Sequence, residues 1–171
     1  MPSRAEIFGA ALGKAIRKTA ATMKAAADEA RVAAAAKPGP AMVRINIRTV
    51  PEEADLDRKD GWIAAQVQLL IDKAGAGAEH VIGRTVLKPG GRHVRHRHHN
   101  CEAFLVVLKG KGHVLSDLGE EPAGEGDVIY LPRDCWHGFN NTSDDDVVLL
   151  WGLLGAGSIG AAGYEADPAA R

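Results

Sequence analysis

The chain has 171 residues, enough for one domain with an appendage. Apolar residues make up 46% and charged residues 25%, a balance typical of a soluble protein, and a net charge of −1 lacks the basic excess of nucleic-acid-binding proteins. The two cysteines are expected to be reduced thiols of a cytoplasmic protein. Two cysteines, no apolar run of about 18 residues and no secretory signal argue against a disulfide scaffold, a membrane protein and a secreted protein.

Residues 1–40 predict an Ala-rich helix that ends at a Pro- and Gly-containing stop, Lys37 to Pro40. Ser3 and Glu6 form a capping box at its start. One stripe of the helix is apolar, made of Phe8, Leu12, Ile16, Thr19 and Met23. This thin stripe cannot hold a helix alone, so we expect it to pack on the rest of the chain or on a second subunit. An organelle-targeting peptide is the alternative, and the acidic residues in the segment argue against it.

The next segments give weaker signals. Met42 to Val50 alternates apolar and polar residues, which predicts a half-buried strand. Pro51 to Asp60 is acidic and predicts a loop. Trp62 to Ile71 is apolar and fits either strands or a short helix, because periodicity does not decide between them. Ala74 to Gly77 predicts a turn.

From residue 80 onward, short apolar runs alternate with turn residues, which predicts an all-β sandwich or barrel within residues 41–171. The runs are Val81 to Leu87, Ala103 to Leu108, His113 to Leu118, Asp127 to Leu131 and Val147 to Leu153. The Gly- and Ala-rich tail, Gly155 to Arg171, is expected to lie against the surface.

Histidines concentrate in one stretch of this region. On a strand, His96 and His98 point to the same face as Val94, while His93, Arg95 and Arg97 point to the other face. Two imidazoles that converge from one strand are suited to binding a transition metal.

Two further side chains complete the predicted site. Glu102 follows a turn at His99 and Asn100 and opens an apolar strand, where a carboxylate is costly unless it is paired or bound to a cation. His137 begins a strand after Pro132 and can supply a third imidazole from across the barrel.

These residues fall into two motifs that resemble those of the cupin superfamily. Residues 90–110 are similar to the first motif, with Gly90, His96, His98, Glu102 and Gly110 in its places and a last gap one residue longer than usual. Residues 126–141 are similar to the second motif, with Gly126, Pro132, His137 and Asn141 in its places. Asp134 replaces the turn glycine of that motif, and Asp tolerates left-handed geometry.

The resemblance implies a cupin-type jelly-roll β-barrel, with the N-terminal helix as an extension, and a homodimer. It implies one divalent transition metal on His96, His98, Glu102 and His137. The ligand types do not choose among Fe, Mn, Ni, Co and Zn. Iron(II) is favoured because this ligand set is common among cupin dioxygenases. The implied partner is a small oxygenated organic substrate, with no nucleic acid and no membrane.

The favoured function is a non-haem Fe(II) dioxygenase. The alternatives are a metal-dependent isomerase, lyase or decarboxylase, a non-catalytic ligand-binding module and a purely structural metal. Because a metal would occupy Glu102, the candidates for a catalytic base are His99, Tyr130 and a metal-bound hydroxide. Cys101 is expected to serve packing, with a redox-sensitive thiol as the alternative.

Overall fold

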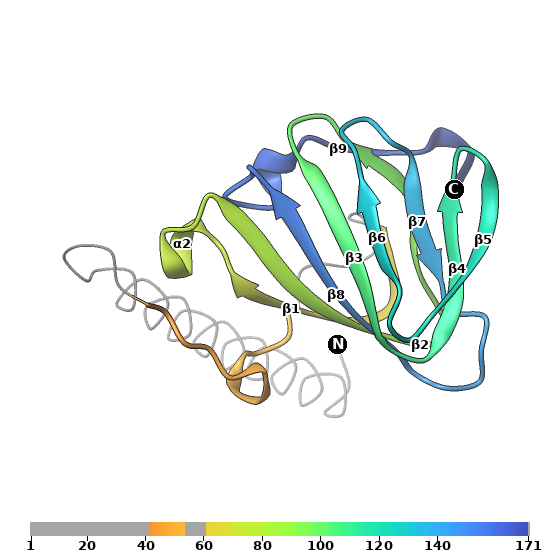
Figure 1. Cartoon of the computed structure of the whole chain (residues 1–171), viewed down its shortest axis with the longest axis horizontal. Helices are drawn as coiled ribbons and strands as arrows, with labels where there is room; N and C mark the ends of the chain where they lie inside the picture. Colours follow the sequence, from red (N-terminus) through yellow and green to blue (C-terminus); the bar gives the residue numbers. More distant parts are fainter. Residues whose placement is uncertain (1–41, 54–60, 171) are drawn as a thin grey trace, which may run out of the picture.

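The computed structural model describes residues 42–53 and 61–170, and nine strands in this part of the chain form one curled sheet (Figure 1). The strands are β1 (Trp62–Ile71), β2 (His80–His98), β3 (Glu102–Lys109), β4 (Lys111–Ser116), β5 (Gly119–Gly124), β6 (Val128–Leu131), β7 (His137–Asn140), β8 (Val147–Leu154) and β9 (Tyr164–Ala166). The helical pieces are α2 (Lys73–Ala76) and the 3₁₀ turns η1 (Ile47–Thr49), η3 (Gly160–Ala162) and η4 (Pro168–Ala170). The predicted all-β fold is confirmed.

The long strand β2 organises the sheet. The strand order is β5-β4-β7-β2-β8-β3-β6, and β1 and β9 also pair with β2. The first half of β2 lies between β1 and β8, and its C-terminal end pairs with β7 and β9. All these pairings are antiparallel. Three segments that are distant in the sequence therefore meet at the end of β2.

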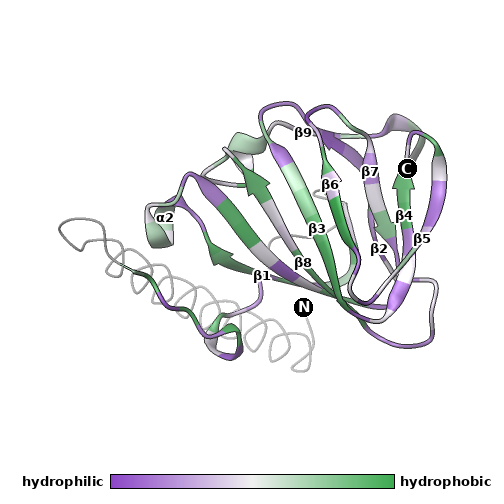
Figure 2. Ribbon diagram, in the orientation of Figure 1, coloured by the Kyte–Doolittle hydropathy of each residue, from purple (hydrophilic) through white to green (hydrophobic). Residues whose placement is uncertain are grey.

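The interior of the curled sheet is closed by two clusters of buried apolar side chains. One cluster contains Val67, Val81, Cys101, Ala103, Leu131, Trp151, Leu153, Ala156 and Ala162, and the other contains Leu87, Val107, Val114, Ala123, Phe139, Val147 and Leu149. Figure 2 shows that β8 is mainly hydrophobic, whereas β5 carries hydrophilic residues. Burial of this apolar surface is the main source of stability.

The strand predicted at Met42 to Val50 is wrong, because this segment contains η1. The side chain of Asn46 accepts a hydrogen bond from the backbone N–H of Arg48, which closes a turn where a strand would have continued. Ile45 and Ile47 are each 39% exposed, so the alternation does not mark a buried face. Trp62 to Ile71, which the sequence left open, is a single strand.

The sequence predicted neither β5 nor β9. β5 contains Pro122 and two terminal glycines, and such residues are tolerated because β5 is an edge strand. The expectation that the tail lies on the surface is wrong for β9, which joins the sheet, and for Ala156 and Ala162, which are buried.

The predicted helix of residues 1–40 lies outside the described residues. Among the described residues, no helix is long and apolar enough to cross a membrane.

Candidate metal centre

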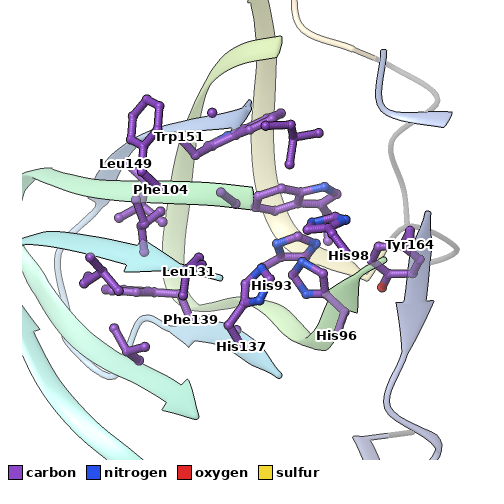
Figure 3. A pocket seen from close by; sticks show the side chains of 18 of the residues that line it. His93, His96, His98, Phe104, Leu131, His137, Phe139, Leu149, Trp151 and Tyr164 are labelled. Atoms are coloured by element: carbon purple, nitrogen blue, oxygen red, sulfur yellow. The ribbon is translucent and has the colours of Figure 1, made fainter. Parts of the chain in front are cut away.

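Three histidines converge at the end of β2. His96 and His98 lie on β2, and His137 begins β7 directly opposite His96 in the strand pairing. Each histidine offers one ring nitrogen, and these nitrogens all lie within 4.8 Å of one another. Figure 3 shows the three rings gathered on one side of a cavity. The strand period and the pairing of β2 with β7 together account for this convergence.

Backbone contacts orient two of the rings. The Nδ1 atoms of His96 and His137 lie 2.8 and 2.9 Å from the backbone oxygens of Val94 and Cys135, respectively. Each neutral ring then donates from Nδ1 and keeps the lone pair of Nε2 for another partner. The Nδ1 atom of His98 is buried and has no hydrogen-bond partner among the described residues. This donor set fits a divalent transition metal.

The surroundings keep the three imidazoles neutral. Burial lowers the pKa of His96 well below its usual value, and the neighbouring histidines lower it further. Burial and the neighbouring His137 lower the pKa of His98 to about 4, and burial also lowers the pKa of His137. Neutral rings are the form that binds a metal, so the site is prepared for a cation at neutral pH.

The structure does not bring Glu102 to this group. Its carboxylate instead lies near Tyr130, a residue that is 57% exposed, and burial together with this carboxylate raises the pKa of the Tyr130 hydroxyl. Ala103 is buried and lines the cavity together with the three histidines. The motif spacing agrees with this placement, because Ala103 lies five positions after His98 and seven before Gly110, which removes the one-residue excess of the last gap. Ala103 thus occupies the place where the motif expects a glutamate.

A fourth histidine lies in the cavity wall, contrary to the simple strand period. The register of β2 against β7 shifts between His93 and His96, and this irregularity turns His93 to the cavity side. Its ring stacks on Trp62 at 3.6 Å and lies 4.0 Å from the ring of His96. Sequence reasoning missed this residue because nothing in the local sequence marks the shift.

The cavity is otherwise apolar. Its apolar lining includes Trp62, Leu105, Ile129, Leu131, Phe139, Leu149, Trp151 and Ile159. The described residues that line it include no Lys, Arg, Asp or Glu. Its volume is about 70 Å³, small beside the few hundred Å³ of common ligand pockets. Such a site favours a compact molecule.

The two predicted base candidates lie away from this cavity. His99 is exposed, and its hydrogen bonds to Asp134 and Glu165 raise its pKa. Tyr130 is on the exposed side of β6 beside Glu102. Neither residue lines the cavity. His93 and Tyr164 are the polar cavity residues besides the three converging histidines.

Other residues noted in the sequence contribute to packing or to local backbone conformation rather than to the cavity. Cys101 is 1% exposed and packs in the core, as expected. Asp134 has φ = 62°, the left-handed conformation anticipated for the residue that replaces the turn glycine. Arg95 and Arg97 lie on the outer side of β2, where both guanidinium groups cover the Trp136 ring.

A curled all-β sheet with a buried histidine cluster defines a barrel protein with an internal group of side chains that could hold a metal. Comparison with known proteins agrees with this description. Residues 83–152 match Cupin_2, the cupin domain family, and this segment contains His96, His98 and His137. Residues 83–152 thus form a cupin domain.

Individual relatives match about half of the chain at moderate sequence identity. SchB of Streptomyces halstedii is 33% identical over 88 residues, which are 51% of this chain and 64% of SchB. A 1-hydroxy-2-naphthoate 1,2-dioxygenase of Nocardioides sp. (strain KP7) is 36% identical over 102 residues, 56% of this chain and 26% of that enzyme. The chain therefore spans less than two thirds of either relative.

Among solved structures, the polyketide cyclase RemF from Streptomyces resistomycificus superposes with a TM-score of 0.58 at 28% identity. This superposition covers 66% of this chain and 79% of RemF.

Proposed function

We propose that this chain is a metal-dependent enzyme that acts on a small oxygenated organic molecule, and that its reaction is that of a non-haem Fe(II) dioxygenase. The observation that carries the proposal is the cluster of three neutral imidazoles at the wall of a small apolar cavity. The similarity to a naphthoate dioxygenase supports the choice of reaction. Iron(II), when bound, supplies a Lewis acid for the oxygen atoms of the substrate and electrons for dioxygen.

The residues of the chain have separate tasks in this proposal. His96, His98 and His137 hold the metal, and Ala103 adds no ligand, which leaves room for substrate atoms. The apolar walls, aromatic and aliphatic, lower the local polarity and strengthen electrostatic interactions inside the cavity. We assign the acceptance of a proton from a substrate hydroxyl to the imidazole of His93, because it lies in the cavity wall beside His96.

The lining also indicates the chemistry of the substrate. Since the described lining residues carry no cationic side chain, a substrate carboxylate away from the metal would be buried without a partner. We therefore favour uncharged ring or chain compounds, such as catechols and 1,3-diketones, over carboxylate-bearing compounds such as gentisate.

The test is dioxygen uptake by the full chain after anaerobic loading with iron(II), with catechol, gentisate, a 1,3-diketone and a thiol as substrates. We expect uptake with catechol or the diketone and at least a hundredfold loss in His96→Ala, an order of magnitude typical for removal of a group that holds the reacting centre. The matched control is His113→Ala, because His113 is only partly buried and its ring contacts Thr142 outside the cavity. Uptake that survives His96→Ala would contradict the proposal.

A redox-neutral reaction is the second candidate, in the class of isomerases, lyases and decarboxylases. The similarity to RemF, named a polyketide cyclase, favours a metal-assisted ring closure of an enolisable carbonyl compound. Product formed without dioxygen consumption, and lost in His96→Ala, would select this candidate.

A further inference from the structure

Tyr164 forms a wall of the cavity that lies outside the family match. The match ends at residue 152, whereas Tyr164 belongs to β9 in the C-terminal tail. Tyr164 and Ile159 are the cavity-lining residues from this tail. The tail therefore adds two side chains to the pocket wall that the segment matched by the family does not contain.

β9 holds Tyr164 firmly beside the histidines. Tyr164 pairs with His98, and the neighbouring Glu165 turns outward to Arg97 at 2.8 Å and His99 at 2.6 Å. At the end of the strand, Asp167 forms an ion pair with Arg95. These contacts fix the strand on its outer side and leave the Tyr164 ring on the cavity side.

The ring contacts two of the proposed ligands. Its centroid lies 5.0 Å from that of His96, with the planes 26° apart, and 6.1 Å from that of His98. A Cβ atom on Gly61 would come within 2.6 Å of the tyrosine hydroxyl, so the far end of the side chain is already enclosed. Figure 3 shows the ring beside His96 and His98, and the cavity lining includes it together with the three histidines.

We propose that Tyr164 is the specificity-determining residue of this pocket, whose ring limits the size of the molecule that can bind at the three histidines. The inference rests on the proposed function in one respect, namely that His96, His98 and His137 hold a metal. It does not depend on which reaction the metal serves.

The experiment uses two probes that present the same nitrogen to a metal but differ by one ring, imidazole and 4-phenylimidazole. Their affinities for the cobalt(II)-loaded full chain are measured from the visible absorption of cobalt. We expect the wild type to favour imidazole and Tyr164→Ala to shift the ratio of affinities toward 4-phenylimidazole by about tenfold, as steric discrimination of this size allows. Tyr164→Phe, which keeps the ring, should retain the wild-type ratio.

Two further variants make the result decisive. Tyr130→Ala removes the other tyrosine, which lies outside the cavity, and should leave the ratio unchanged. Tyr164→Leu should shift the ratio in the same direction as Tyr164→Ala. It is used instead of Tyr164→Ala if the alanine variant does not fold. An unchanged ratio in a folded, cobalt-loaded Tyr164→Ala or Tyr164→Leu would overturn the inference.

Cobalt stoichiometry separates the two proposals. One cobalt per wild-type chain, lost in His96→Ala, supports the metal site whatever the probe ratio shows. A wild-type chain that binds no cobalt would remove both proposals.

Discussion

At the scale of single residues, one position decides the net charge of the candidate metal site. Ala103 lines the cavity where the motif expects a glutamate, and Glu102 lies one residue earlier on the side of Tyr130. A one-residue difference in strand register reverses which face a side chain takes, so the two residues cannot exchange places without a bulge.

This placement gives a direct prediction. Glu102→Gln should leave the cobalt affinity within about twofold, because its carboxylate is not with the imidazoles. Ala103→Glu should raise the affinity by about tenfold or more, since it adds an anionic ligand beside three neutral ones. Competition with a chelator of known affinity measures both. Loss of the metal in Glu102→Gln would restore Glu102 as a ligand.

The three buried imidazoles also predict a pH dependence for the metal-free protein. Because burial lowers their pKa values in the folded state, the unfolded chain binds more protons between the usual value of 6.5 and the folded values. The free energy of unfolding should therefore fall as the pH drops from about 6.5 toward about 4. At about 1.4 kcal/mol per pKa unit, His98 alone accounts for about 3 kcal/mol.

Urea unfolding of the chelated protein at several pH values measures this dependence, and His98→Asn should flatten it. His99 acts in the opposite direction, because its raised pKa stabilises the fold at low pH and that contribution is lost as the pH rises. The pKa values of Glu165 and Asp167 are lowered, so these residues lose their contributions only below about pH 4. A stability that does not change across the histidine range would contradict the assignment.

At the scale of elements, Asn141 joins the turns on which β2, β7 and β8 depend. Its buried amide donates to the backbone oxygens of Leu87, Lys88 and Asp145, and its oxygen accepts from Ser143. The asparagine therefore ties the middle of β2 to the loop after β7, close to the strand that carries His137.

Asn141→Ala should destabilise the fold by about 2–4 kcal/mol, because it leaves buried carbonyl groups without donors. Chemical denaturation measures the loss. Asn100→Ala is the control, since the amide of Asn100 makes one exposed hydrogen bond to Ala161 and its removal should cost under about 1 kcal/mol. Equal effects of the two changes would show that Asn141 has no special role.

The strands and the histidine face followed from periodicity, because a regular strand fixes which residues point together. The period placed His96 and His98 on one face, and the turn residues after them located β3. What the sequence could not show are the places where the period breaks. The register shift before His96 moved His93 into the cavity, and the turn before β3 decided between Glu102 and Ala103.

Two other features depend on contacts that the sequence pattern does not show. β9 is three residues long and has no apolar run of its own, so its place follows only from its partner β2. The alternation in Met42 to Val50 was real, but the local hydrogen bond of Asn46 prevailed over it.

At the scale of the whole molecule, the proposed homodimer and the role of residues 1–40 stay predictions. If the Ala-rich segment docks on a second subunit, deletion of residues 1–38 should reduce the mass measured by light scattering from that of a dimer toward that of a single chain. An unchanged mass would leave the segment without a part in assembly.

The long reach of β2 has a consequence for biosynthesis. Its last residues carry two of the three clustered imidazoles, but the third comes with β7 and the neighbouring wall with β9. A nascent chain on the ribosome therefore has no complete cluster until His137 has left the exit tunnel, and no closed pocket until Tyr164 has followed it. Under the proposed function, the nascent chain can hold the metal on all three imidazoles only after His137 has emerged.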